Sequence, residues 1–174
     1  HGFHRSLFDL LAFPGKEIES SILIDLYKRK LTFIDLGESL KLSTKQLALY
    51  VFIIHQSICT TANELTIEPK TEIKRKANQR VFLKIYGLMR ELPKGKDKDK
   101  KIDYKEGITP ALSRIKKAVS EIRFLDNVKA YIPERIDGAL RVKIPPTKVF
   151  VAKYIKKVDA VENGEQGSEA EKPK

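Results

Sequence analysis

The longest uninterrupted apolar run in this chain extends from Leu47 to Ile54, with the sequence LALYVFII. It is far shorter than the roughly 20 apolar residues that a membrane-spanning helix needs, so we expect no membrane segment. A helix that is apolar on every side must be buried on every side. The 174-residue chain is long enough to build a core around such a helix, and the alternative is that a second chain covers part of it.

This run ends a longer segment, Leu31 to Val51, with the sequence LTFIDLGESLKLSTKQLALYV. Gly37 is small enough for close helix packing, and Ser43 suits the N-cap of a second helix. The order of these residues, with leucines on both sides of the turn, resembles the helix-turn-helix of repressor and winged-helix DNA-binding proteins over about twenty residues. Lys41 departs from the pattern, because Gly usually takes the left-handed turn at that position. The resemblance implies two helices joined by a tight turn.

In the second helix of such a motif, the exposed first turn meets the base edges or the phosphates of DNA. The resemblance therefore implies a DNA contact by Lys41, Ser43, Thr44, Lys45 and Gln46. A glutamine side chain can pair with adenine, and a lysine can contact guanine or a phosphate. The alternative is a pair of packed core helices with a coincidental serine cap.

The clearest helical pattern extends from Thr71 to Leu92, where apolar residues recur at steps of four and three. The stripe that we expect to face the core consists of Ile73, Ala77, Val81, Ile85, Leu88 and Leu92. The first half of the same helix is strongly basic. We expect a phosphate clamp made by Lys70, Lys74, Arg75, Lys76 and Arg80. Such cations neutralise phosphates without reading sequence, and the alternative is a solvated helix face.

Two further helices are expected elsewhere in the chain. Apolar residues at a spacing of four predict one from Lys16 to about Lys30. The second is opened by Thr109 as its N-cap and Pro110 at its first helical position. Before it lies the charged segment 93–107, PKGKDKDKKIDYKEG, which has no core-forming pattern and is the best candidate for a domain boundary.

The segment ALRVKIPPTKVFVAKYI predicts two strands on either side of Pro145 and Pro146. Apolar and basic residues alternate in its first half, as in a half-buried strand, which places Arg141 and Lys143 on the outer face. A basic hairpin after a helix is typical of the wing of a winged helix, which follows a phosphate backbone or enters the minor groove. An equal possibility is a hairpin that closes a small core and leaves its cations solvated.

The charge of the chain favours a polyanionic partner. The net charge is +11 and the isoelectric point is about 9.6. Residues 159–174 contain five acidic residues and two lysines, so the rest of the chain is more basic still. A field of this sign attracts polyanions, of which nucleic acid is the commonest. We expect residues 159–174 to form a disordered acidic tail.

The sequence contains few residues in an arrangement that suggests catalysis or metal binding. Cys59 is the only cysteine, so the chain can form neither an internal disulfide nor a cysteine zinc site. His55 lies in the apolar helix, where a core or interface position suits it better than a ligand role. We therefore predict no enzymatic activity, no cofactor and no metal site.

These patterns together predict an α+β fold, mainly α with a small β-hairpin. The expected parts are a helical domain over 1–92 with the helix-turn-helix, the linker 93–107, a helix-plus-hairpin unit over 108–158 and the tail 159–174. The predicted function is binding of double-stranded DNA, preferred to RNA, as a regulator, a replication or partition factor or a chromatin-like protein. The alternative is a structural subunit of a virion coat or ribonucleoprotein that binds without sequence choice. We expect an intracellular protein or particle component that forms a homodimer or higher assembly, with Phe52 and Ile53 at the interface.

Overall fold

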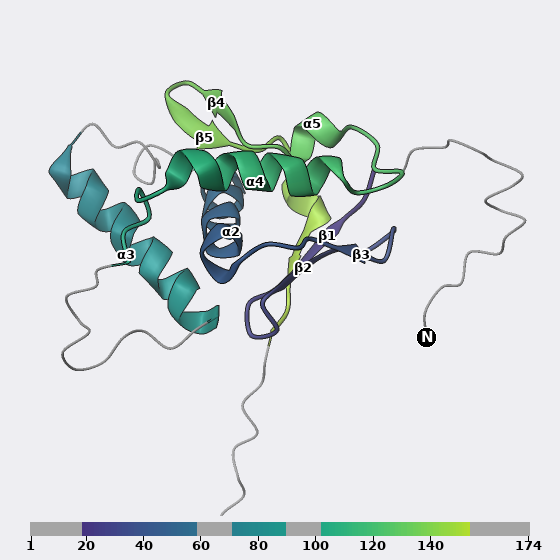
Figure 1. The fold of residues 1–174 in the computed structure, drawn as a ribbon, viewed down its shortest axis with the longest axis horizontal. Coiled ribbons are helices and arrows are strands. Elements are labelled where there is room, and N and C mark those ends of the chain that lie inside the picture. The colour runs from purple at the N-terminus through teal and green to yellow at the C-terminus, as the bar shows by residue number, and fades with distance from the viewer. Residues whose placement is uncertain (1–18, 59–70, 90–101, 154–174) are drawn as a thin grey trace, which may run out of the picture.

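The computed structural model describes residues 19–58, 71–89 and 102–153 (Figure 1). These residues form helices, a small mixed sheet and a separate two-stranded hairpin, which confirms the predicted α+β class. The helices are α2 (Thr44–Ile58), α3 (Glu72–Met89), α4 (Ile108–Ser120) and α5 (Val128–Tyr131). Lys70, Leu92, most of the predicted linker and the predicted acidic tail lie outside the described residues.

Helix α2 is the centre of the core. Every residue from Leu47 to Ile54 is buried, and the helix packs against α3, α4 and strand β5 (Ala139–Arg141). Phe52 and Ile53 are completely buried within a single chain. The prediction that these two residues form an oligomer interface is therefore wrong, because the helix's own chain covers every side of the apolar run.

The region before α2 is not helical. It forms β1 (Ile22–Asp25), β2 (Lys30–Phe33) and β3 (Glu38–Ser39), which pair in antiparallel order. Gly37 makes the turn between β2 and β3 with a φ of 68°, and its N–H donates to the Phe33 carbonyl at 2.9 Å. The predicted helix over residues 16–30 is wrong where the structure describes it, and so is the predicted first helix of the helix-turn-helix.

These predictions failed because the same spacing of apolar residues fits both a helix and a strand. A spacing of four residues is shared by one face of a helix and one face of a strand, since side chains alternate with a period of two in a strand. In the folded chain Ile22 and Ile24 from β1, with Leu31 and Phe33 from β2, point to the core at strand spacing. The intervening residues, such as Thr32, lie on the outer face and are only partly buried.

The C-terminal strands are divided between two sheets. Strand β6 (Val149–Val151) joins β1 in parallel and completes the sheet order β3-β2-β1-β6. Strand β5 pairs instead with β4 (Glu134–Ile136) around a turn at Asp137 and Gly138, both at positive φ. The predicted pairing around the two prolines is therefore wrong. The predicted alternation is confirmed, since Leu140, Val142 and Ile144 are buried.

Helices α3 and α4 form close to where the sequence predicts them, with differences in detail. The buried residues of α3 are Asn78, Phe82, Ile85, Tyr86 and Met89. The helix is thus turned about one residue away from the predicted stripe, and Ile73 and Leu88 are 83% and 47% exposed. Helix α4 starts after Gly107, which adopts a φ of 67° as the N-cap, so Thr109 is not the cap.

The two sides of the predicted linker share one core. Tyr104 is buried against Phe52 of α2 and Phe82 of α3. The side chain of Gln79 in α3 holds this segment, donating to the Ile102 carbonyl at 2.5 Å and accepting from the Tyr104 N–H at 3.2 Å. Helix α4 then packs on α2, so the part of the chain before the linker and the part after it bury one another.

Candidate nucleic-acid interface

The first turn of α2 is held by a reciprocal cap. The Ser43 N–H donates to Oε1 of Gln46 at 3.0 Å, and the Gln46 N–H lies 3.4 Å from Oγ of Ser43. This is a capping box, in which both orphan donors at the start of a helix find an acceptor. The predicted N-cap at Ser43 is confirmed, and the side chains of both residues contribute to it.

Lys45, another residue of the predicted contact, pairs with an acidic side chain of its own chain. Nζ of Lys45 lies 3.9 Å from the Glu106 carboxylate, just before α4, and both Thr44 and Lys45 are partly buried. Beyond Gln46 the helix is buried almost to its end. A recognition helix needs one long exposed face to lie in the major groove. Only the first turn of α2 has that exposure, so the structure does not present α2 as a groove-filling helix.

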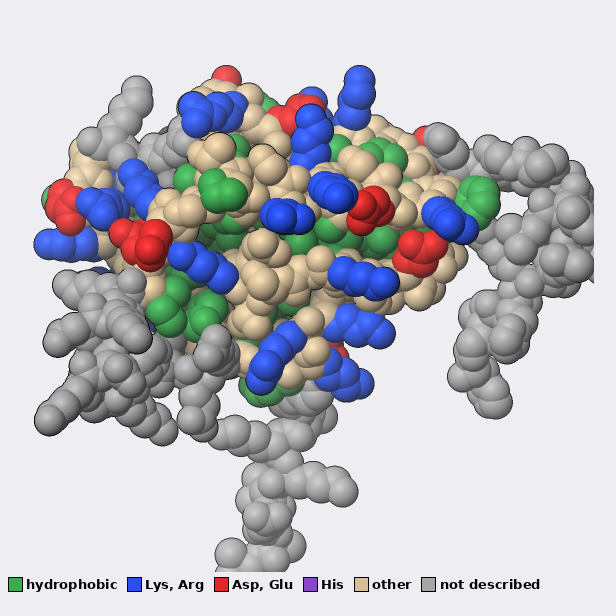
Figure 2. Space-filling model, viewed as in Figure 1, with side chains coloured by type: hydrophobic (Ala, Val, Ile, Leu, Met, Phe, Trp, Pro, Cys, Tyr) green, Lys and Arg blue, Asp and Glu red, His purple; other side chains and the backbone are tan. Residues whose placement is uncertain are grey.

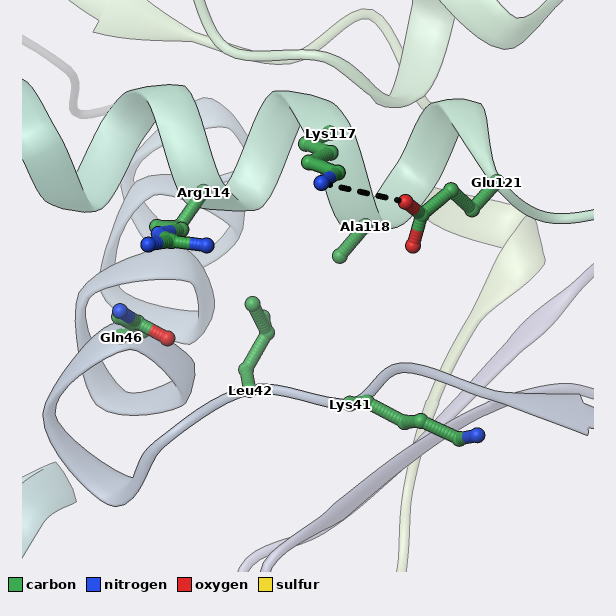
Figure 3. Close-up of a pocket in the computed structure, with 7 residues that line it drawn as sticks. All are labelled: Lys41, Leu42, Gln46, Arg114, Lys117, Ala118 and Glu121. Carbon is green, nitrogen blue, oxygen red and sulfur yellow. Dashed lines mark ion pairs between the residues drawn. The ribbon is translucent and has the colours of Figure 1, made fainter.

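A groove lies between this first turn and α4 (Figure 3). It has a volume of about 400 Å³. Its lining residues are Lys41, Leu42, Gln46, Arg114, Lys117, Ala118 and Glu121. One wall is α4, and the other is the loop from β3 together with the start of α2. Figure 3 shows the Leu42 side chain pointing toward Ala118 across the middle, while Gln46 and Arg114 lie together at one end.

The groove is electropositive. Arg114 and Lys117 project from the same side of α4, three residues apart, and Lys41 comes from the opposite wall. Glu121 is the single acidic residue in the lining, and its carboxylate pairs with Nζ of Lys117 at 3.8 Å. Lys41 and Arg114 have no ion pair with any acidic residue in the described parts of the chain. Two cations without a described acidic partner therefore line the groove, and the third, Lys117, is shared with Glu121.

The basic half of α3 is arranged differently. Arg75 lies 3.2 Å from the Asp103 carboxylate and 3.9 Å from that of Glu72. It therefore ties the segment before α4 to α3. Lys74, Lys76 and Arg80 are exposed, and none pairs with an acidic residue that the structure describes. In Figure 1 the first half of α3 lies beyond the N-terminal end of α4, away from the groove.

The predicted wing is largely neutral. Nζ of Lys143 lies 3.1 Å from the Glu134 carboxylate on the neighbouring strand β4. Arg141 is half-buried in β5. The hairpin therefore presents less free positive charge than its sequence indicates, and neither residue lines the groove.

The groove residues on α4 are absent from the sequence-based prediction. Arg114 and Lys117 are exposed residues of an amphipathic helix, as are cations that contact only solvent. Their partner across the groove, Lys41, is far away in the sequence. No local pattern shows that α4 lies against the loop before α2, so the signal for this site exists only in the tertiary structure.

Within the described residues no cluster of histidine, cysteine and acidic side chains is arranged to hold a metal ion. None of the helices in that part of the chain is long and apolar enough to cross a membrane. Comparison of the chain with protein-family models, with curated proteins and with solved structures finds no match.

Proposed function

We propose that this protein binds nucleic acid through the phosphate backbone, without reading the bases, and that the groove between α2 and α4 is its principal contact. The observation that carries the proposal is that three cations from two elements, Lys41, Arg114 and Lys117, line one groove with a single carboxylate. Cations that face a shared groove bind a chain of phosphates better than the same cations spread over a convex surface.

The rest of the molecule supports a polyanionic ligand. The net charge of the whole chain is +11. Figure 2 shows lysine and arginine side chains spread over the face that carries α4, with acidic side chains between some of them. Such a field steers a polyanion toward this face from a distance and makes the association rate depend on salt.

The groove favours a duplex over a stretched single strand. Proteins that hold single strands usually stack the bases on aromatic side chains. No aromatic residue lines this groove, and its apolar centre consists of the aliphatic side chains of Leu42 and Ala118. Duplex DNA, the partner expected from the sequence, is therefore the first ligand to examine.

Fluorescence anisotropy with two labelled DNA duplexes of unrelated sequence, each at two salt concentrations, tests the proposal. We expect equal affinities for the two duplexes and a steep fall in affinity with salt, because each neutralised phosphate releases counterions. A strong preference for one sequence would contradict backbone binding without base readout. Absence of binding at low salt would contradict the proposal as a whole.

The nucleoprotein-subunit alternative shares this mode of binding and differs in assembly. Since the side chains of Phe52 and Ile53 are buried, an assembly must use another surface. Light scattering of the protein with and without DNA separates the two possibilities. A coat subunit should form large particles on DNA, whereas a simple backbone-binding protein should form complexes whose mass grows in proportion to DNA length.

A further inference from the structure

One end of the groove presents hydrogen-bond donors. Oε1 of Gln46 accepts the Ser43 N–H at 3.0 Å, and an N–H must have an oxygen, not an NH₂ group, as its partner. The capping box therefore fixes which way the Gln46 amide is turned. Its NH₂ group is on the side of Arg114, as Figure 3 shows. A guanidinium and an amide NH₂ group are both donors, so they have no acceptor to offer each other.

We propose that Gln46, Arg114 and Lys117 form a discrete site for a phosphoryl group, which binds a terminal phosphomonoester in preference to an internal phosphodiester. The inference rests on the proposed function, because it takes a nucleic-acid strand end as the ligand. It goes further in assigning a specific phosphate at which binding is strongest.

The preference follows from charge and from the number of acceptor atoms. A phosphomonoester carries a charge of about −1.5 to −2 near neutral pH and presents three terminal oxygens. An internal phosphodiester carries a single negative charge and two non-bridging oxygens. Arg114 offers a planar fork of donors, Lys117 an ammonium group and Gln46 the two hydrogens of its amide. A monoester brings a third terminal oxygen and a larger negative charge to these donors, so it can gain more from them than a diester can.

Glu121 limits the same site. Its carboxylate competes with a ligand for Lys117 at 3.8 Å and would repel an anion in the groove. Arg114 and Lys117 outnumber this one carboxylate, and Lys41 adds a further cation on the opposite wall, so the groove keeps a positive excess. A diester carries only one negative charge, so it neutralises less of this positive charge. Its binding free energy at the site is therefore less favourable.

The test compares two duplexes of one sequence, one with 5′-phosphate ends and one with 5′-hydroxyl ends. We expect the full-length protein to bind the phosphorylated duplex about fivefold to tenfold more tightly at pH near 7.5, the effect of one additional charge-assisted hydrogen bond. The preference should shrink at pH near 5, because the second pKa of a phosphomonoester is about 6. At each pH the affinity for the phosphorylated duplex is divided by the affinity for the hydroxyl duplex. This ratio removes any effect of pH on binding that the two duplexes share.

The decisive variant is Gln46→Glu. Glutamate at this position keeps the capping box, so α2 should remain as stable as before, but it replaces the amide donor with a negative charge. We expect the variant to lose the preference for the phosphorylated duplex and to keep the thermal unfolding midpoint of the unmodified protein. Lys76→Gln, which removes a cation outside the groove, should retain the preference and is the matched control.

Equal affinities for the two duplexes in the unmodified protein, with steep salt dependence, would overturn this inference and leave the proposed function standing. Retention of the preference by Gln46→Glu would overturn the assignment to this site. Inorganic phosphate, titrated against sodium chloride at equal ionic strength, distinguishes the sources of the phosphoryl group. If it abolishes the preference at low millimolar concentration, the site takes any phosphate dianion. If it does not, the site requires the strand end.

Discussion

The molecule has two basic regions, and they differ in how their cations are organised. In the first half of α3 the cations are close in sequence, at Lys74, Arg75, Lys76 and Arg80, but they point outward from a convex helix. One of them, Arg75, is occupied by two carboxylates. In the groove Arg114 and Lys117 come from α4 and Lys41 from a part of the chain far away in the sequence, yet all three line a common space.

The difference shows that density of charge along a chain does not measure convergence of charge in space. Neighbouring residues of a helix point in directions 100° apart, so a run of basic residues surrounds the helix with charge. Residues from two packed elements can converge, because each element turns one face toward the other. On this basis we expect the groove, rather than α3, to make the stronger contact with a polyanion.

The largest effect should come from the double substitution Arg114→Ala with Lys117→Ala. We expect affinity for duplex DNA to fall about tenfold to a hundredfold near 0.1 M salt, and the slope of log K against log salt to decrease by about 2. Both side chains are exposed, so the urea midpoint should not change. Anisotropy titrations at several salt concentrations measure both quantities. An unchanged slope would remove the groove from the interface.

The substitution Arg75→Ala should affect folding more than binding. Arg75 connects α3 to Asp103, but it is about half exposed, and such pairs contribute about 0.5–1 kcal/mol at most. We expect a loss of stability within that range, measured by urea unfolding, and little change in DNA affinity. Lys74→Ala is the control, because Lys74 is a neighbouring exposed cation without a described ion pair. A large loss of affinity with unchanged stability would show that Arg75 contacts the ligand directly.

The double substitution Lys76→Ala with Arg80→Ala should have a smaller effect on binding than the groove pair. These cations lie on one face of α3 outside the groove and contribute to the general field of the protein. We expect about a threefold loss of affinity and a decrease in slope of less than about 1, since few phosphate contacts are lost. Results equal to those of the groove pair would mean that both regions contact the same duplex.

The smallest effect should come from Glu121→Gln, and its direction is opposite. Removing the carboxylate frees Lys117 and takes a negative charge out of the groove. We expect affinity for either duplex to rise about twofold, as for other exposed ion pairs of modest strength. Glu38→Gln, which removes an acid that does not line the groove, should have a smaller effect. A loss of affinity in Glu121→Gln would show that this carboxylate orients Lys117 for binding.

Several features of the fold follow from local sequence patterns. The apolar run from Leu47 to Ile54 predicts a fully buried helix, and Ser43 predicts where that helix begins. The long helix α3 and the alternation around Val142 are similarly readable. In each case a single periodicity or a single cap indicates the type of the element and where it lies in the sequence.

Other features depend on contacts that no local pattern contains. Residues 22–39 have apolar spacings that suit either a helix or a strand, and the pairing of β1 with β2 and with β6 decides the outcome. On α3 the apolar residues cover more than one face, so the position of Tyr104 and α2 selects which of them are buried. Likewise, the burial of Phe52 and Ile53 depends on how much of the chain surrounds α2.

The sequence by itself determined the α+β class, the positions of the main helices, the cap at Ser43 and the excess of positive charge. Only the tertiary structure decided where that charge converges. Helical period and charge count describe residues that are neighbours along the chain, whereas the groove joins Lys41 to Arg114 and Lys117 through the packing of α4 on α2. That packing is decided by buried apolar side chains, and these do not depend on the cations that they bring together.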